Sequence, residues 1–358
     1  MAYKITDRYM LPIKNSKIFT FVLVVLLSSS CRSDNIFDSK YIRVERPRSI
    51  ALPCEIIPCD VPGAVHGFVV DSFYVFYTML HPEHRFAVYD RRTMTPLTNL
   101  VRVGRGPNEY NYLTPGQRTC NDEGSGFWFY SGSKQESARL NLTKSITEDK
   151  VCIDSRLSLT ELDIPGNVGS PGQLFAFDRI NDTLALYQII RGTYVSGGIY
   201  DFQKRIEIQR FKLSIQSNKE PNLTGGPIAI SPDLTRMVML PVYFDQINIC
   251  YVDGSDRKSI STCSKPLSLT QIESKAPETR PMYYIDVETT NERIVALYQN
   301  HQTGLTEIHL FDWAGDLQTI LTTANPIRSI SLDTQAGFLY GFISSEEICK
   351  MDINTWLQ

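Results

Sequence analysis

The chain has 358 residues, of which 21% are charged and 11% are aromatic, and its formal net charge at pH 7 is −3. This length is ample for a large hydrophobic core. The near balance of charge leaves no basic patch of the kind that nucleic-acid binding requires, so we expect no nucleic-acid partner. Proline and glycine are spread along the chain without a low-complexity linker, which indicates one folded domain with frequent turns.

The N-terminus has the pattern of an export signal. An apolar run of ten residues, IFTFVLVVLL, occupies positions 18–27 and follows Lys14 and Lys17. It is shorter than the roughly 20 apolar residues that span a bilayer, and it fits the hydrophobic region of a secretory signal. Three serines then precede Cys31, an arrangement that resembles the lipobox of bacterial lipoproteins, in which the cysteine is lipidated.

We therefore expect a signal peptide at 1–30, a tether at 31–40 lipidated at Cys31, and a folded domain at 41–358. The resemblance implies a bacterial outer-membrane lipoprotein, held by its lipid anchor on the periplasmic or the cell-surface face. An uncleaved N-terminal membrane segment is the alternative.

A turn built around an aspartate and followed by apolar and aromatic residues recurs six times in the rest of the chain. Neighbouring aspartates are separated by 47 to 56 residues, and they are Asp71, Asp122, Asp178, Asp233, Asp286 and Asp333. Repeats of this length with strand-like content are typical of β-propeller blades. We predict an all-β, six-bladed β-propeller with four-stranded antiparallel blades, and we interpret the aspartates as turn caps.

The blades are expected at 66–103, 117–162, 172–216, 226–264, 281–323 and 327–356. Clean alternation of apolar and polar residues predicts strands at 85–90, 246–253 and 307–312. The stretch SLTQIES at 268–274 predicts a short helix in a loop between blades. Two strand-like pieces within 41–53, YIRV and SIAL, could add an outer strand to the last blade and close the ring.

The stretch VGRGPNEY at 103–110 follows the first blade. It resembles the G-[RK]-G-P-G-E-[YF] segment of the six-bladed, TolB-like or NHL-like β-propeller lipoproteins of Bacteroidetes, with Asn108 in place of a glycine. That resemblance implies the fold and a place in the cell envelope, and it implies no particular activity. The matching residues are Gly104, Arg105, Gly106, Pro107, Glu109 and Tyr110.

Two interpretations of this segment remain open. Arg105 either bonds backbone carbonyls at a corner between blades, or lies at the rim of the central channel and holds an anionic group or a sugar hydroxyl. Under the second interpretation Arg105, Glu109 and Tyr110 are binding residues. No helix is predicted after the glycines, so a phosphate-binding loop is not expected.

The sequence offers little for catalysis. It has neither a G-x-S-x-G nor an H-E-x-x-H motif, and its five histidines suggest no metal site, so no cofactor or metal is expected. Carboxylates that could pair for glycoside hydrolysis are Glu109, Asp122, Asp178 and Asp286, but sequence does not show their separation. Cys54 and Cys59 are close enough for a local disulfide, and the later cysteines are expected to be mostly buried free thiols.

The favoured function is an exported scaffold that binds a glycan, a peptide or a protein through the loops of its propeller. The alternative is a propeller enzyme, such as a polysaccharide lyase, a hydrolase or a lactonase-like protein, with its site at the mouth of the central channel.

Overall fold

A computed structural model describes the chain at residues 39–164, 173–191, 194–211, 217, 220–263 and 266–357. The chain divides into two compact units, Met1–Asp34 and Asn35–Gln358, and all described residues belong to the second. The predictions for the signal peptide, for Cys31 and for most of the tether therefore fall outside the described residues.

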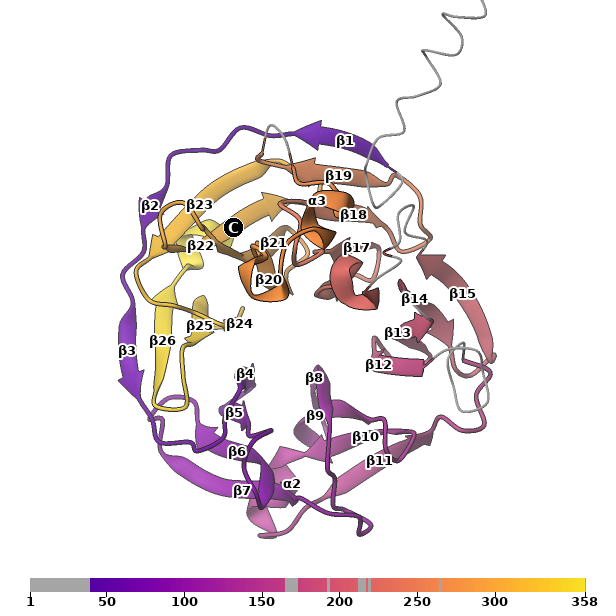
Figure 1. Ribbon diagram of the computed structural model, residues 1–358. Coiled ribbons are helices and arrows are strands. Elements are labelled where there is room, and N and C mark those ends of the chain that lie inside the picture. The colour runs from indigo at the N-terminus through magenta and orange to yellow at the C-terminus, as the bar shows by residue number, and fades with distance from the viewer. Residues whose placement is uncertain are drawn as a thin grey trace, which may run out of the picture. The chain divides into compact units, whose positions relative to one another are not determined.

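Six blades, each of four antiparallel strands, stand around a common axis (Figure 1). The predicted six-bladed β-propeller is therefore confirmed, and the predicted blade ranges agree with the sheets to within a few residues. From the axis outward, the strands of blades one to three are β4 (His66–Val70), β5 (Phe73–Tyr77), β6 (His84–Asp90) and β7 (Pro96–Arg102); β8 (Thr114–Asn121), β9 (Gly124–Ser131), β10 (Glu136–Asn141) and β11 (Ile153–Ser158); β12 (Gln173–Arg179), β13 (Leu184–Arg191), β14 (Tyr194–Asp201) and β15 (Ile206–Phe211).

Blades four to six follow the same plan. Their strands are β16 (Ile228–Ile230), β17 (Arg236–Met239), β18 (Ile247–Tyr251) and β19 (Lys258–Ser261); β20 (Tyr284–Thr289), β21 (Arg293–Gln299), β22 (Thr306–Asp312) and β23 (Leu317–Thr323); β24 (Ser329–Asp333), β25 (Phe338–Phe342), β26 (Glu347–Asp352) and β3 (Glu55–Pro58).

Aromatic packing between blades forms much of the core. Each blade packs between two others, so its central strands are buried on both faces and read as short continuous apolar runs, such as FYVFY in β5. Between blades one and two, the ring of Phe127 meets those of Phe68 and Phe86 edge to face, with centroids 5.0 and 4.9 Å apart. Aromatic pairs in this geometry stabilise a core beyond the area that they bury.

The N-terminal segment of the propeller, residues 40–58, wraps around the outside of three blades, and we call it the strap. Its first strand, β1 (Lys40–Arg43), pairs in parallel with β19, and β2 (Ile50–Ala51) pairs in parallel with β23. Only β3 supplies the outer strand of the last blade, by antiparallel pairing with β26. An outer strand on the last blade was predicted from YIRV and SIAL, but these pieces lie on blades four and five.

A disulfide joins Cys54 of the strap to Cys349 of β26, with their Cα atoms 5.7 Å apart. The expected local pair of Cys54 and Cys59 is therefore wrong, because β3 places Cys54 opposite blade six. Cys59 is a free thiol, and burial raises its pKa to about 11. Cys250 is buried and free as expected, whereas the free Cys120 is exposed.

The repeated aspartates serve two purposes. Asp71 lies in the turn after β4 with a φ of 51°, and Asp233 and Asp333 each accept a backbone hydrogen bond of 3.1 Å within their turns. Asp178 and Asp286 lie inside β12 and β20, and each binds the inner strand of a neighbouring blade. The turn-cap interpretation is wrong for these two, because their strands continue past the aspartate.

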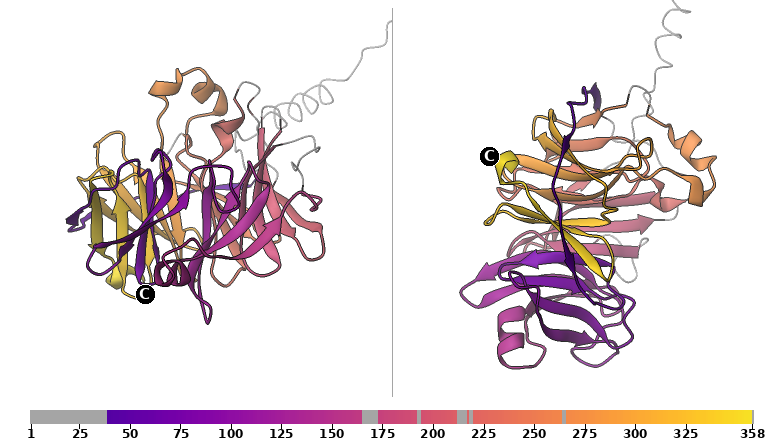
Figure 2. Two further views of the ribbon diagram at one scale, coloured as in Figure 1. Left: turned by 90° about the horizontal axis from the view of Figure 1, so that it is seen from below. Right: turned by 90° about the vertical axis from the view of Figure 1, so that its left-hand side faces the viewer.

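Short helices decorate the connections. The predicted helix is confirmed as α3 (Leu269–Glu273), where Ser268 forms a capping box with Gln271. It packs with η1 (Pro221–Thr224) through Leu223 and Ile272, and this part stands away from one face of the propeller in Figure 2. The other helices among the described residues are α2 (Leu142–Thr147), η2 (Pro277–Thr279) and α4 (Asn354–Leu357).

Candidate functional site

Five ionisable side chains on the inner strands gather near the axis of the ring. They are His66 on β4, Arg118 on β8, Asp178 on β12, and Asp286 and Glu288 on β20, and we call them the axial cluster. The guanidinium of Arg118 acts electrostatically on each of the other four. Strands from four different blades therefore bring their charges to one place.

Arg118 and Glu288 form a two-pronged ion pair. Nη2 donates to Oε1 at 2.5 Å and Nη1 donates to Oε2 at 3.3 Å. β8 belongs to blade two and β20 to blade five, which lie opposite each other in a ring of six. The pair therefore crosses the axis, in the geometry by which arginine binds carboxylates most strongly.

Asp178 and Asp286 link inner strands to each other. Oδ1 of Asp178 accepts a hydrogen bond from the Gln117 amide at 2.7 Å, and Oδ2 of Asp286 accepts one from the Ile330 amide at 2.8 Å. Burial raises the pKa of Asp178 to about 6 and that of Asp286 to about 7, although these amides and Arg118 act in the opposite direction. Both carboxyl groups therefore change protonation close to neutral pH.

His66 completes the cluster in its neutral form. Its ring stacks on Phe68, with centroids 5.7 Å apart and an angle of 27° between the planes. Burial, with a contribution from Arg118, lowers the pKa of His66 to about 4. The imidazole is therefore uncharged at pH 7, and Arg118 is the positive charge of the cluster.

A cavity of about 280 Å³ opens beside Arg118, where blades one, two and six meet. Arg91 of blade one forms an ion pair with Asp333 of blade six at its edge. On the other side, the Ser125 hydroxyl donates to Asp71 Oδ2 at 2.7 Å. The lining residues are 69–71, Arg91, 118–120 and 332–335. Of the axial cluster only Arg118 lines this cavity, so a small ligand in it would meet that guanidinium.

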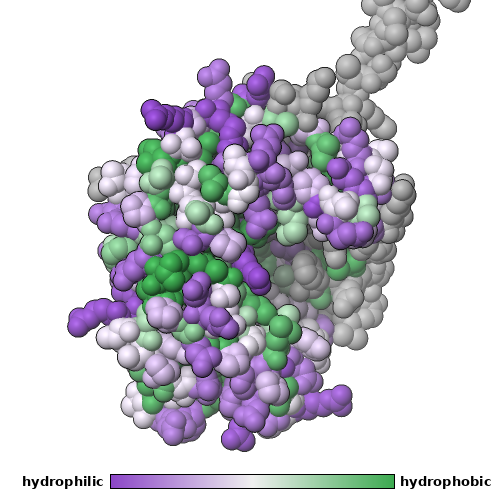
Figure 3. All heavy atoms as spheres, turned by 60° about the vertical axis from the view of Figure 1, so that its left-hand side comes forward, coloured by the Kyte–Doolittle hydropathy of each residue, from purple (hydrophilic) through white to green (hydrophobic). Residues whose placement is uncertain are grey.

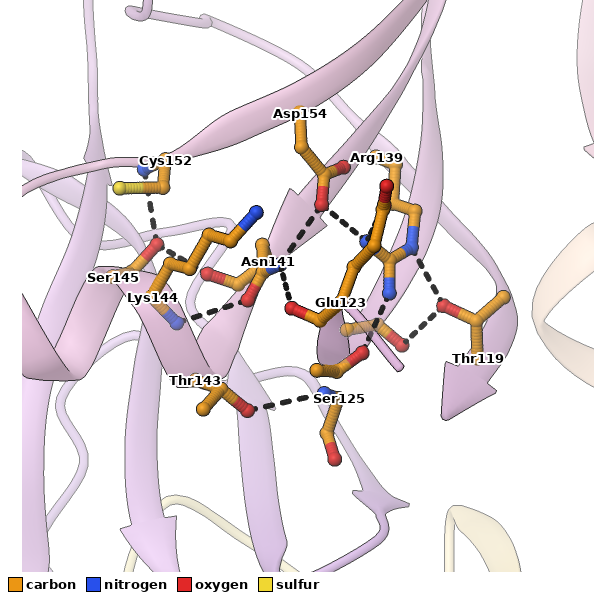
Figure 4. A network of polar contacts seen from close by, with 12 residues as sticks. Thr119, Glu123, Ser125, Arg139, Asn141, Thr143, Lys144, Ser145, Cys152 and Asp154 are labelled. Atoms are coloured by element: carbon orange, nitrogen blue, oxygen red, sulfur yellow. Dashed lines mark hydrogen bonds and ion pairs between the residues drawn. The ribbon is translucent and has the colours of Figure 1, made fainter. Parts of the chain in front are cut away.

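A polar network holds blade two beside this cavity (Figure 4). Arg139 forms an ion pair with Asp154, and its Nε donates to Thr119, which lines the cavity, at 2.9 Å. Asn141 caps the N-terminus of α2, and its side-chain amide donates to Asp154 at 2.8 Å. The network therefore fixes α2 and Thr119 together.

The predicted segment at 103–110 forms the connection between β7 and β8. The carboxylate of Glu109 accepts a hydrogen bond from the Gly106 amide at 2.9 Å. A Cβ atom at Gly104 would lie 2.2 Å from Oε2 of Glu109, so a side chain there would displace the Glu109 carboxylate. Glu109 therefore stabilises its own loop, although it also lines a cavity on the rim.

Tyr110 is buried and holds the loop to blade two. Its hydroxyl donates to Oε1 of Glu136 at 2.5 Å and accepts from Nη1 of Arg156 at 2.7 Å. Arg156 also donates to Oδ1 of Asn108 at 2.6 Å. Tyr110 thus serves the interface between blades, and it offers no hydroxyl to the surface.

Arg105 is exposed, and it has no hydrogen bond or ion pair among the described residues. The arginine that bonds backbone carbonyls at this corner is Arg85 on β6, which is 6% exposed. Arg85 donates to the carbonyls of Thr78, Met79, His81 and Tyr110 at 2.9 to 3.3 Å. Arg105 thus lies at the surface, Glu109 bonds its own loop and Tyr110 is buried, and a binding role for the three residues stays a prediction.

Two cavities lie on the outer rim of blade one. The first has a volume of about 540 Å³ and is lined by His84, 98–102, 107–109 and 149–151. The second has a volume of about 320 Å³ and is lined by 60–62, Thr78, His81, His84, Ala87, Tyr89 and 96–99. They share His84, Thr98 and Asn99, so they flank the same strand, β7. Neither cavity was predicted from the sequence.

Arg118 and Glu288 also escaped the sequence analysis. They are 170 residues apart in the chain and lie in no motif. Their strands carry the only available signal, since a charged residue within an inner strand needs a partner. Of the four candidate carboxylates, Asp178 and Asp286 belong to the axial cluster through their shared interaction with Arg118, whereas Glu109 and Asp122 lie in loops.

Within the described ranges, no helix is long and apolar enough to cross a membrane. Among the same residues, no group of three or more histidines, cysteines or acidic residues is placed to hold a metal ion. His309 is a satisfied structural histidine, since its two ring nitrogens contact the Tyr284 hydroxyl at 3.0 Å and Glu307 Oε2 at 2.7 Å.

Comparison with known proteins gives a fold and no family. No family model matches the chain, and no curated protein matches it in sequence. Among solved structures, a predicted exported protein of Bacteroides fragilis NCTC 9343 is similar with a TM-score of 0.53 and 11% identity, over 87% of this chain and 99% of that one. A member of the DUF4221 family from Bacteroides vulgatus ATCC 8482 is similar with a TM-score of 0.54 and 9% identity, over 85% and 97%.

At these identities the likeness shows the propeller fold alone. The fold expected from the resemblance to six-bladed lipoproteins is therefore confirmed. Membership of the TolB-like or NHL-like family stays a prediction.

Proposed function

We propose that this protein is an exported lipoprotein whose propeller is a rigid binding scaffold for a partner outside the cytoplasm. The proposal rests on a contrast between two parts of the propeller: carboxylates on the axis are already bonded by the protein, whereas the rim has open cavities. On the axis, both oxygens of Glu288 and both oxygens of Asp286 accept hydrogen bonds from the protein itself. On the rim, two cavities open beside β7.

Rigidity supports a scaffold role. The strap adds strands to blades four, five and six, and the disulfide fastens it to the last blade. A closed ring has fewer unpaired sheet edges and holds its loops in fixed positions. Preformed surfaces lose less conformational entropy on binding, which favours recognition of a glycan, a peptide or a protein.

Export and lipidation are supported by the N-terminal sequence pattern and by the presence of a disulfide, which persists in oxidising compartments. The solved relative named as a predicted exported protein is consistent with that place. The outer membrane, on its periplasmic or cell-surface face, is the proposed location.

The test is a binding screen of the soluble form that starts at Ser33, against panels of glycans, peptides and envelope proteins. Saturable binding without turnover supports the scaffold. If no member of any panel binds the folded protein, the proposal is wrong.

One observation favours the alternative, an enzyme with its site on the axis. Asp286, with a pKa raised to about 7 by burial, could serve as a general acid or base near neutral pH. Incubation with polysaccharides and lactones tests this function. Turnover that disappears in Asp286→Asn, while the variant melts normally, would support the enzyme.

A further inference from the structure

We propose that the outer edge of β7 docks an extended peptide of a partner protein, which adds to blade one as a fifth strand. This inference rests on the proposed binding function and names its partner class. It concerns the seven residues of β7, Pro96–Arg102, and the two cavities beside them, which we call the first groove (about 540 Å³) and the second groove (about 320 Å³).

β7 is an edge strand with one neighbour. It pairs with β6, and no other described strand pairs with it. An edge strand presents backbone N–H and C=O groups that an incoming strand can bond. Recognition of this kind takes its affinity from main-chain hydrogen bonds and its specificity from pockets for alternate side chains. β7 therefore provides the free main-chain edge that such recognition requires.

The two grooves can serve as pockets for alternate side chains because they lie on opposite faces of blade one. The second groove includes Ala87 and Tyr89, which pack toward blade six. The first groove includes Leu100, which packs toward blade two. Successive side chains of a β-strand point to opposite faces. A strand added to β7 would therefore direct its side chains alternately into the first and the second groove.

The two grooves differ in chemistry. The first is lined by charged groups that include Arg102, Glu109, Asp149 and Lys150. In the second groove half of the lining is polar, and the other half is apolar and consists of Val61, Pro62, Ala87, Tyr89, Pro96 and Leu97. The fitting occupant is thus an extended segment in which polar or charged residues alternate with apolar ones.

The usable part of the edge is short. A β-bulge falls where Thr98 pairs with Val88 and Pro96 pairs with Tyr89, which leaves Leu97 as the extra residue. Val101 has a φ of 62°, so the regular extended backbone runs from Thr98 to Leu100. Residues 98–102 all line the first groove. The bulge marks one end of the docking site.

The chain itself uses this mode of binding on the neighbouring blades. The strap adds strands to the outer edges of β19, β23 and β26, and it leaves blade six at Pro58. The next residues, Asp60, Val61 and Pro62, line the second groove. A peptide on β7 would add to blade one the kind of outer strand that the strap adds to blades four, five and six. Figure 3 turns the side that bears β2 and β3 forward and shows hydrophobic residues at the surface among hydrophilic ones.

β15 offers a matched comparison within the same protein. It is also an edge strand without a second described neighbour, and it exposes Ile206 by 51% and Ile208 by 47%. Neither groove is lined by any residue of β15. If exposed apolar residues alone decided the docking site, β15 would be the better candidate. The two grooves make β7 the better candidate.

The experiment uses the soluble form that starts at Ser33 and synthetic peptides of the length of β7, with alternating apolar and charged residues. The same peptides with alternate backbone nitrogens methylated are the chemical control, since they keep the side chains and lose donors. Loss of main-chain bonds should weaken binding by about tenfold or more. Hydrogen exchange then locates the site, and binding should slow exchange of amides within 96–102.

Two lysine variants complete the test. Leu97, which is 42% exposed and lines the second groove, is changed to Lys, and Ile208→Lys is the matched control on β15. Leu97→Lys should abolish peptide binding, and Ile208→Lys should leave it unchanged. The inference is overturned if methylated peptides bind equally well, if the protected amides lie on β15, or if no peptide binds while a glycan does. If only a glycan binds, the proposed scaffold function stands and the peptide site on β7 is wrong. If neither a peptide nor a glycan nor a protein binds, the scaffold function is wrong as well.

Discussion

Arg118 on β8 and Glu288 on β20 join opposite blades of the ring through a two-pronged ion pair across its axis. Each side chain is largely enclosed, with 32% and 15% of its surface exposed. Removal of one partner leaves the other charge unpaired. Arg118→Met or Glu288→Gln should therefore lower the free energy of unfolding by about 1–3 kcal/mol.

The double variant should lose less than the sum of the two single losses, because the second change removes the charge that the first left unpaired. Denaturant unfolding of the four proteins measures this coupling. Strictly additive losses would show that the two side chains do not depend on each other.

The stability of the ring should depend on pH through Asp178 and Asp286. Their pKa values in the folded state, about 6 and about 7, lie above the ordinary value of 3.8. The folded state thus holds these protons more tightly than the unfolded chain, so their contribution is complete below pH 4 and is lost as pH rises through 6 to 7.

Asparagine at these positions cannot ionise, so Asp178→Asn and Asp286→Asn should each flatten the decline of the unfolding free energy between pH 4 and pH 8. Urea titrations at several pH values measure the unfolding free energy and so the steepness of this decline. A decline equally steep in both variants and the parent would rule out these carboxyl groups as its source.

The disulfide between Cys54 and Cys349 should stabilise the whole propeller, because it closes a loop that spans 295 residues. Replacing both cysteines by serine should lower the free energy of unfolding by about 2–5 kcal/mol. Hydrogen exchange within 40–58 should also quicken as the strap loosens. Cys263→Ser, a half-buried free thiol, is the control and should have a smaller effect.

Arg85 and Arg105 lie at the same corner of the molecule and should respond differently to truncation. Arg85→Ala removes a buried charged donor from four carbonyls and should lower the free energy of unfolding by about 1–3 kcal/mol. Arg105→Ala should stay within about 0.5 kcal/mol of the parent, as exposed positions usually do. Thermal unfolding of both variants decides this, and a larger loss for Arg105→Ala would contradict the structure.

Lipidation of Cys31 is a separate expectation from the N-terminal pattern. Cys31→Ala should release the protein from the membrane or block its processing, and labelled fatty acid should no longer enter it. Incorporation of label into the variant would contradict the assignment.

The fold was predictable because its signals are local. Each blade carries one of the repeated aspartates with a run of apolar strand residues close to it, although only some of these aspartates, such as Asp71 and Asp233, lie in turns. The short helix α3 was predictable for the same reason, since Ser268 and Gln271 form its capping box within one turn.

The strap and the axial cluster were not predictable because their partners are distant in the chain. Cys54 lies 295 residues from Cys349, and Arg118 lies 170 residues from Glu288. The pattern of two strand-like pieces showed that extra strands exist, but the choice of outer edge depends on the closed ring. The motif at 103–110 was recognised, but Arg105 is exposed, and the buried Arg85 bonds the backbone carbonyls that one of the two interpretations assigned to Arg105.

The central claim is that the propeller binds a partner and does not transform it. The most direct measurement is titration of the soluble form against the ligand that binds best in the screen, with product analysis on the same samples, for the parent and for Asp286→Asn. The account predicts saturable binding of equal affinity in both proteins and unchanged ligand after incubation. Conversion of the ligand by the parent, lost in a normally folded Asp286→Asn, would contradict it and would make the axial cluster an active site.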